Sequence, residues 1–354
     1  MKNSRGSGSV TVDDVAAHAG VSIKTVSRVL NNEANISAKT RARVQASMAE
    51  LKYHPNPSAR RLASKRSDLI ALLYDSPDDS HLVHLQHGAL DACRRSFHSL
   101  LLHPVDYRSP TLADEVLQLV RQRACAGLVL TAPLCDVPAL VQALDASDVP
   151  FARLAPYTPS ARGVAVRSPD RLAARAMTAH LIGLGHRRIG FVRGHADHGV
   201  MHERFHGYRD AFDDAGLPVD ETLIEAGSNT FESGVQAGRR LLARVAGPSA
   251  IFASTDAMAA GVLYAAHATG ITVPSALSVA GCGDTPLSRQ TWPALSSVRL
   301  PVREMACAAV EQLVARGAPV RLPQLDYLLM PRESIAAPPP RRSLAPAAAC
   351  ALDA

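Results

Sequence analysis

The sequence contains no apolar run that approaches the roughly 20 residues needed to span a lipid bilayer. Its opening stretch, MKNSRGSGSV, lacks the apolar segment of a secretory signal peptide. Three catalytic signatures are also missing: the G-x-S-x-G elbow, the P-loop, and G-x-G-x-x-G at a strand-to-helix turn. We therefore expect a cytoplasmic protein that has no membrane anchor and is not an enzyme.

The six cysteines include no C-x-x-C pair, which argues against a disulfide framework and against structural zinc. Two histidine groups are the remaining metal candidates: His81, His84 and His87, and then His195, His198, His202 and His206. The last three are spaced four residues apart and could line one helical face. Because few carboxylates accompany them, we favour ordinary hydrogen-bonding histidines and expect neither metal nor cofactor.

Residues 11–30 carry the pattern of two short helices joined by a tight turn. Apolar residues from Val12 to Ala19 lie on one helical face, and Thr11 with Asp14 forms a capping box at its start. Gly20 supplies the turn and Ser22 caps the next helix. In that second helix we expect Val26, Val29 and Leu30 to be buried and Ile23, Lys24, Thr25, Ser27 and Arg28 to point outward. This arrangement is a helix-turn-helix, whose second helix enters the major groove of DNA.

The charge distribution agrees with a DNA partner. Residues 1–66 hold 12 Lys and Arg against 4 Asp and Glu, whereas the remainder holds 26 against 28. A third helix, from Ser37 to Leu51, closes the small core, and its outward Lys39, Arg41 and Arg43 either contact phosphates or simply face solvent. At the second helix we expect Ile23 and Lys24 to touch bases, with Lys24 and Arg28 suited to guanine.

Many positions of this segment resemble the lactose and galactose repressor family of bacterial transcription regulators. They are Val15-Ala16, Ala19 to Ser22, Thr25 to Asn31, Ser37, Thr40-Arg41, Tyr53, Pro55-Asn56, Ala59-Arg60 and Leu62. The resemblance implies that residues 56–64 form a hinge helix on operator DNA and that Leu62 wedges into the minor groove. The alternative is that residues 56–66 form only a basic linker. The predicted DNA contacts are Thr11, Ser22, Ile23, Lys24, Thr25, Ser27, Arg28, Asn31, Asn56, Ala59, Arg60 and Leu62.

From Leu69 onward, short apolar runs alternate with helical segments, which is typical of βαβ units on parallel sheets. The runs LIALLY, SLLLHPV, GLVLT and PFARL form a first series, and GVAV, RIGFV, TLIEA, SAIFAS and LSVAG form a second. We expect two α/β lobes like those of periplasmic sugar-binding proteins, as the resemblance implies. Residues 296–300, 302–315 and 325–330 are then expected to cross back and complete the first lobe.

Ligands of such lobes bind beyond the carboxyl ends of the strands, so we expect an effector in the cleft between the lobes. The candidate residues follow successive predicted strands: Asp75, Ser80, His81, Arg204, Phe231, Asp256 and Asp284. Carboxylates, an arginine and one aromatic ring suit a sugar or another small polar compound.

The resemblance assigns effector contact to Arg204 and Asp256. The alternatives are a surface arginine at a helix start and an aspartate that caps the next helix. The sequence departs from the family at Thr255, where Asn is usual, and at Gly281-Cys282-Gly283-Asp284, where Gly, an aromatic residue and two aspartates are common. Both departures border the predicted cleft, so the identity of the effector does not carry over.

We thus expect an all-α helix-turn-helix headpiece (9–55), a hinge (56–66), a two-lobed periplasmic-binding-protein-like α/β effector domain (67–337) and a disordered tail (338–354). The tail has no leucine heptad for a tetramer, so a homodimer on pseudo-palindromic double-stranded DNA is expected. The predicted function is a transcription regulator, a repressor, controlled by a small effector such as a sugar. The alternative is a sugar-binding or receptor protein whose basic front is incidental.

Overall fold

The computed structural model describes residues 10–30, 36–53, 67–75, 79–315 and 325–338. The chain divides into two compact units, residues 1–67 and 68–354. The predicted contacts Asn31, Asn56, Ala59, Arg60 and Leu62 lie outside the described residues, as does most of the predicted tail. None of the described helices is both long and apolar enough to cross a membrane.

The first unit is a bundle of α1 (Val12–Ala19), α2 (Ile23–Leu30) and α3 (Ala38–Glu50). Val15, Val26 and Val44 are fully buried at its centre, as the helical periodicity predicted. The capping box is present, because the backbone N–H of Thr11 donates to the Asp14 carboxylate over 2.8 Å and Thr11 Oγ1 accepts from the Asp14 N–H. Gly20 adopts a left-handed conformation with φ of 60°, which reverses the chain between α1 and α2.

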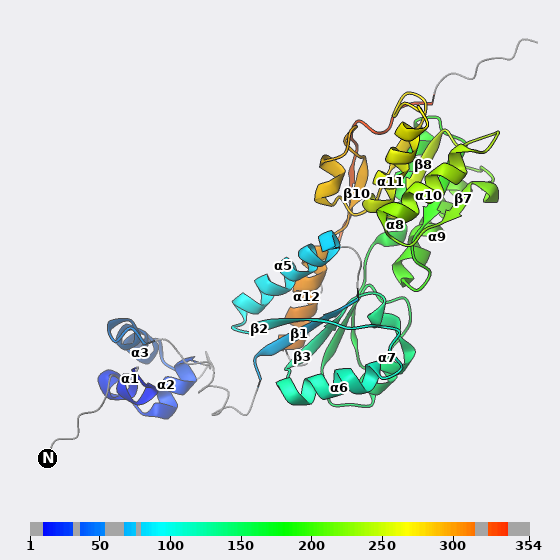
Figure 1. Cartoon of the computed structure of the whole chain (residues 1–354). Coiled ribbons are helices and arrows are strands. Elements are labelled where there is room, and N and C mark those ends of the chain that lie inside the picture. Colours follow the sequence, from blue (N-terminus) through cyan, green and yellow to red (C-terminus); the bar gives the residue numbers. More distant parts are fainter. Residues whose placement is uncertain (1–9, 31–35, 54–66, 76–78, 316–324, 339–354) are drawn as a thin grey trace, which may run out of the picture. The chain divides into compact units, whose positions relative to one another are not determined.

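The second unit contains two α/β lobes (Figure 1). The first has a parallel five-stranded sheet in the order β2-β1-β3-β4-β5. Its strands are β1 (Leu69–Tyr74), β2 (Ser99–Pro104), β3 (Gly127–Leu130), β4 (Phe151–Leu154) and β5 (Val164–Val166). Its helices are α5 (Asp79–Arg95), α6 (Leu112–Arg123), α7 (Pro138–Asp145) and α12 (Val302–Ala315). Successive β1 residues alternate between two cores, one under α5 and α12 and the other under α6 and α7.

The second lobe has a parallel sheet in the order β7-β6-β8-β9. Its strands are β6 (Ile189–Arg193), β7 (Ile224–Ala226), β8 (Ala250–Ala253) and β9 (Ser278–Ala280). Its helices are α8 (Asp170–Gly183), α9 (Gly199–Asp214), α10 (Phe231–Leu242) and α11 (Asp256–Ala268). Tyr208 of α9 packs against Phe191 of β6 with ring centroids 4.7 Å apart, while α10 and α11 cover the other face.

The structure corrects two assignments of strands to lobes. GVAV, placed in the second series, forms β5 and pairs in parallel with β4 of the first lobe. Residues 296–300 and 325–330 do not complete the first sheet. They contain β10 (Ser297–Arg299) and β11 (Leu328–Met330), which pair antiparallel with each other and pack on α8 of the second lobe. A periodic pattern identifies a strand but not the sheet it joins, which depends on contacts with residues distant in the sequence.

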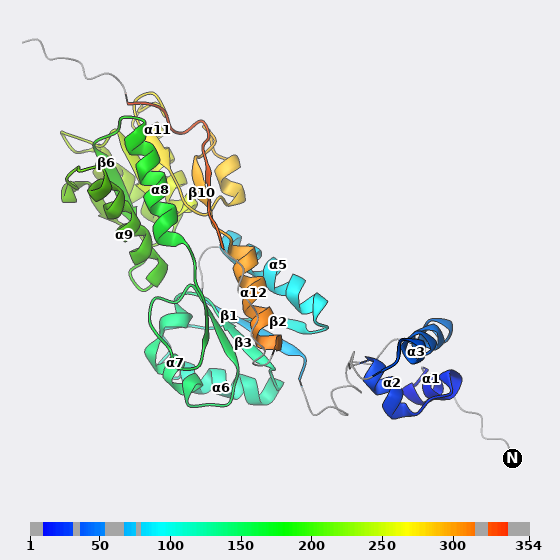
Figure 2. The same ribbon diagram turned by 180° about the vertical axis from the view of Figure 1, so that it is seen from behind.

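Among the described elements of that final segment, α12 crosses back to the first lobe, where it lies beside α5 in both views (Figures 1 and 2). The chain after β11 remains on the second lobe, where the Val279 N–H donates to the Ser334 carbonyl over 2.8 Å. The helix α9 begins at Gly199, and Met201 belongs to its buried face. Arg204 therefore stands in its second turn.

The packing of α5 on α12 leaves no room for a side chain at Gly88. A Cβ there would lie 2.0 Å from the backbone carbonyl oxygen of Arg303, which cannot rotate away. We predict that Gly88→Ala destabilises the protein by about 2 kcal/mol through overpacking, although alanine favours an isolated helix by about 1 kcal/mol. Urea unfolding followed by circular dichroism measures the change.

The control is Gly183→Ala in α8, where a Cβ meets no heavy atom within 4 Å. It should leave the free energy of unfolding unchanged or raise it slightly. Equal stabilities of the two variants would contradict the close packing of α5 and α12.

Candidate functional site

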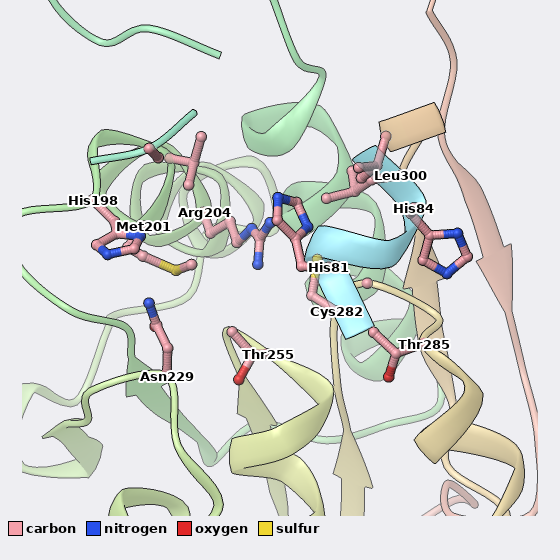
Figure 3. A pocket seen from close by; sticks show the side chains of 14 residues that line it. His81, His84, His198, Met201, Arg204, Asn229, Thr255, Cys282, Thr285 and Leu300 are labelled. Carbon is pink, nitrogen blue, oxygen red and sulfur yellow. The ribbon is translucent and has the colours of Figure 1, made fainter. Parts of the chain in front are cut away.

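The candidate effector site is a cleft between the two lobes of the second unit (Figure 3). The segments that line the cleft follow strands of both sheets, as expected for the ligand site of open α/β sheets. It contains about 710 Å³ of space, part of which is open solvent. The first lobe and the crossover to α12 contribute His81, His84, Ala132, Leu300 and Val302, and the second lobe contributes His198, Val200, Met201, Arg204, Asn229, Thr255, Cys282, Gly283 and Thr285.

Arg204 lines this cleft and is only 6% exposed. Its Nε donates to the Asp170 carboxylate over 2.6 Å, and its Nη1 donates to the carbonyl of Ser254. These two contacts fix the plane of the guanidinium. Arg204 is therefore a buried residue of the cleft, and the alternative of a surface arginine at a helix start does not hold.

His198 precedes α9 and is half-buried in the cleft. Burial, together with the nearby imidazoles of His195 and His81, lowers the pKa of His198 to about 4, against a smaller opposing effect of Asp197 and Asp75. The imidazole is thus neutral at pH 7 in the ligand-free protein. Neutral imidazole has one donor and one acceptor for a bound molecule.

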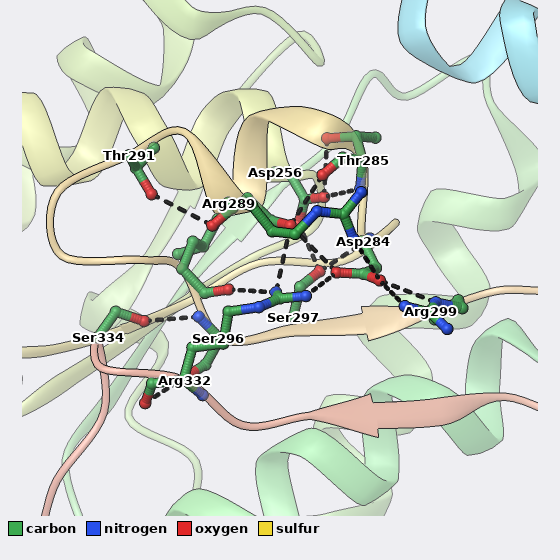
Figure 4. A network of polar contacts seen from close by, with 12 residues as sticks. Asp256, Asp284, Thr285, Arg289, Thr291, Ser296, Ser297, Arg299, Arg332 and Ser334 are labelled. Atoms are coloured by element: carbon green, nitrogen blue, oxygen red, sulfur yellow. Dashed lines mark hydrogen bonds and ion pairs between the residues drawn. The ribbon is translucent and has the colours of Figure 1, made fainter.

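Two predicted carboxylates, Asp256 and Asp284, are buried behind the cleft and bonded to the protein itself (Figure 4). Asp256 accepts from Ser297 Oγ over 2.5 Å, and from the backbone N–H and hydroxyl of Thr285 over 2.7 and 3.0 Å. Burial raises the pKa of Asp256 despite these bonds. Asp256 does not cap α11, because the Thr255 hydroxyl accepts the Met258 N–H instead.

Asp284 has a fully buried side chain that accepts from Arg332 and, over 2.8 Å, from Arg299. Burial raises its pKa, but hydrogen bonds from these two arginines outweigh the effect and hold the pKa below the usual aspartate value. Neither Asp256 nor Asp284 is among the residues that line the cleft. The structure therefore does not place these two carboxylates where they were expected to meet an effector.

Two further predicted residues, Asp75 and Phe231, are not among those that line the cleft. Asp75 accepts the backbone N–H of Tyr107 over 3.0 Å and lines a shallow depression on the first lobe. Phe231 is 39% exposed at the start of α10 and packs edge-on against Tyr264, so its ring does not face the cleft. The side chain of Ser80 is not among those described. Of the predicted effector contacts, the structure brings His81 and Arg204 together.

The cleft residues that the prediction omitted are mainly His84, His198 and Asn229. The sequence suggests His84 and His198 only as possible zinc ligands. Their place in the segments that follow predicted strands is the signal that could have identified them as cleft residues. Among the described residues, no group of three or more His, Cys, Asp or Glu is arranged to hold a metal ion. In the histidine row that was considered as a metal site and not favoured, His206 is exposed and His202 bonds the carbonyl of Ala196 over 2.9 Å.

The two lobes also touch at the rim of the cleft. Tyr107 Oη of the first lobe donates to the Asp197 carboxylate of the second over 2.6 Å. Beside it, Arg108 Nη2 lies 3.3 Å from His195 Nε2. All four side chains are at least partly exposed. These contacts can break and form at little cost when the lobes move.

In the headpiece, α2 presents the outward surface that the sequence predicted. Ile23 is 52% exposed, and Lys24, Ser27 and Arg28 are exposed as well, while Thr25 is half-buried. Two of the predicted DNA contacts also serve as caps. Thr11 Oγ1 bonds the Asp14 carboxylate over 2.7 Å, and Ser22 Oγ accepts the Thr25 N–H over 3.2 Å.

The buried Asp284 gives a test of the network behind the cleft. We predict that Asp284→Asn lowers the free energy of unfolding by about 2 kcal/mol at neutral pH, because it leaves the largely buried Arg332 without its counter-charge. Asparagine tolerates the positive φ of 47° at this position, so the backbone is preserved. Urea titration at a series of pH values measures the effect.

The pH dependence follows from the lowered pKa of Asp284. Its stabilising contribution is complete above the ordinary aspartate pKa and is lost as the pH falls through the lower folded value, so the variant and the wild type should converge in acid. Asp213→Asn, at an exposed position of α9, is the control. A variant as stable as the wild type at neutral pH would contradict this role.

Comparison with known proteins assigns both units. Residues 11–56 match the lacI family of bacterial regulatory proteins, and residues 178–335 match a periplasmic binding protein-like domain. The regulator GalR of Escherichia coli K12 is 30% identical over 335 residues, covering 93% of this chain and 96% of GalR. CelR of Thermobifida fusca is 34% identical over 339 residues, covering 92% and 98%.

Solved structures agree with this assignment. A CelR–cellobiose complex is similar with a TM-score of 0.70 and 32% identity, covering 92% of this chain and 99% of that one. The lac repressor dimer bound to operator and the anti-inducer ONPF is similar with a TM-score of 0.73 and 27% identity, covering 93% and 100%. This chain therefore belongs to the lacI family of bacterial regulatory proteins, and it is a DNA-binding transcription regulator with a two-lobed periplasmic-binding-protein-like domain.

Proposed function

We propose that this regulator is a repressor that binds a pseudo-palindromic operator as a homodimer and that a small polyhydroxylated effector in the cleft sets its operator affinity. The observation that carries the proposal is the cleft itself, lined from both lobes and holding the ordered Arg204 guanidinium. The similar CelR and lac repressor were solved with cellobiose and with ONPF and operator. The headpiece match argues against an incidental basic front.

On the DNA side, the exposed surface of α2 supports base contact by Ile23, Lys24 and Arg28. The first turn of a recognition helix lies nearest the base edges, and an ammonium group suits O6 and N7 of guanine. We infer that Ser27 and Thr25 contact the same groove and that the helix starts at Thr11 and Ser22 approach phosphates. The hinge contacts Asn31, Asn56, Ala59, Arg60 and Leu62 remain part of the proposal, with Leu62 as the minor-groove wedge.

On the effector side, a ligand held between the lobes binds most tightly when both lobes touch it. It therefore favours one lobe arrangement over others and shifts the population of dimer states that bind the operator. The rim pairs Tyr107–Asp197 and Arg108–His195 are placed to accompany such a change. We infer no catalytic role, and we infer action at the chromosome, hence in the cytoplasm.

Selection from a random duplex pool, performed with the full chain at fixed salt, tests the DNA half of the proposal. We predict enrichment of a two-fold symmetric site with half-sites related by about one helical turn. Lys24→Ala should then lose about 1–3 kcal/mol of discrimination at one base pair of each half-site, as measured by fluorescence anisotropy on matched and mismatched duplexes.

Lys39→Ala, at an exposed position of α3, is the control and should weaken all duplexes alike or none of them. Unchanged base preference in Lys24→Ala would remove that residue from the contacts. Enrichment of no sequence, with binding that depends on salt alone, would overturn operator recognition.

A further inference from the structure

We propose that the effector is a small polyhydroxylated anion, bearing a carboxylate or a phosphate group, rather than a neutral sugar. The inference rests on the proposed effector function of the cleft and specifies its ligand. Four features of the cleft carry it: the carboxylates that are missing from its lining, the unused donors of Arg204, the uncapped start of α9, and the histidines.

Among the described residues that line the cleft beside His198 and Arg204, none is an aspartate or a glutamate. Asp170 and Glu203 line adjoining hollows, and Asp170 is itself bonded to Arg204. Neutral sugars are usually recognised through hydroxyl groups that donate to strong acceptors, of which carboxylates are the strongest. Asp256 and Asp284, the nearest candidates along the chain, are occupied by Ser297, Thr285 and arginines behind the wall. Gly283 also lines the cleft, but glycine has no side chain that could accept a hydrogen bond.

Arg204 keeps donors for a ligand. Its Nε and Nη1 are used by Asp170 and by the Ser254 carbonyl, but none of the hydrogen bonds found among the described residues involves Nη2. Arg204 is more than nine-tenths buried and lines the cleft, so Nη2 is reached from the cleft. A guanidinium N–H group that faces a cleft is available to a ligand, and an anionic oxygen is its best acceptor.

The start of α9 supplies a second donor group. No side chain caps this 16-residue helix, and its first residues Gly199 and Val200 have no hydrogen bond through their backbone N–H among the described contacts. Val200 and Met201 line the cleft. Unpaired N–H groups and the positive end of a helix dipole both favour a negative charge.

The histidines complete the set, because His81, His84 and His198 line the same cleft from α5 and from the start of α9. The groups around His198 are His81 of α5, His195 and Asp197 of its own loop, and Asp75 at the end of β1. Since burial and the two histidines hold the pKa of His198 near 4, a bound anion would raise that pKa. Binding should therefore take up protons at neutral pH.

Isothermal titration calorimetry on the full chain tests the proposal with glucose, gluconate, glucose 6-phosphate and inorganic phosphate. Inorganic phosphate probes the anion site without requiring the right sugar, and it should bind in the millimolar range. Gluconate or glucose 6-phosphate should bind at least about tenfold more tightly than glucose, and the preferred one identifies carboxylate or phosphate as the group. Repeating the titration in buffers of different ionisation enthalpy should reveal proton uptake.

His198→Asn tests whether the anion binds in the cleft. His206→Asn, on the exposed part of α9, is the control for the loss of a histidine outside the cleft. We expect anion affinity to fall several-fold and proton uptake to shrink in the first variant only. Binding of glucose as tight as that of gluconate and glucose 6-phosphate, or no binding of inorganic phosphate, would overturn the proposal.

Different results would contradict effector control of operator affinity and the anionic nature of the effector. If a neutral sugar alters operator affinity while anions do not bind, effector control stands and the anionic ligand is excluded. If phosphate and a sugar anion bind but leave operator affinity unchanged, the anion site stands and its role in regulation is excluded.

Discussion

The buried polar network around Asp256 and Asp284 is the constraint on which the effector domain depends. Ser297 of β10 bonds Asp256 at the start of α11 and the backbone of Asp284 after β9. Arg332, in the segment after β11, bonds the Asp284 carboxylate. Buried carboxylates are tolerated only when they are paired and hydrogen-bonded, and here every such contact comes from the protein. The network thus holds the crossover between the lobes firmly on the second lobe, directly before the chain enters α12.

This placement has consequences for the cleft. With the aspartates committed to structure, the described lining consists of apolar residues, histidines, Arg204 and small polar groups. Because α12 packs on α5 and its first residue Val302 borders the cleft, a ligand that touches both lobes acts on the crossover. The contact between Tyr107 and Asp197 at the rim is exposed and therefore weak. A ligand that changes the lobe arrangement would lose little free energy by breaking it.

The sequence predicted the headpiece in detail, because its caps, turn glycine and apolar stripe are local signals. It also predicted most strands of the lobes, which are apolar runs buried on both faces. It did not assign β5, β10 and β11 to the correct lobe, since the pattern of a strand does not reveal which distant strand it pairs with. Nor could it show that Asp256 and Asp284 turn inward: a carboxylate after a strand suits a ligand contact and an internal hydrogen bond equally, and the choice depends on Ser297 and Arg332, which come from distant parts of the chain.

The central claim is that occupancy of the cleft controls operator affinity. The direct measurement is a fluorescence anisotropy titration of the selected operator with the full chain at fixed salt, with and without a ligand shown by calorimetry to bind the cleft. The account predicts that the ligand changes the operator dissociation constant by about tenfold or more, a coupling of roughly 1.4 kcal/mol, and that the operator changes the ligand affinity by the same factor. Identical operator affinity with the cleft empty and saturated would contradict it.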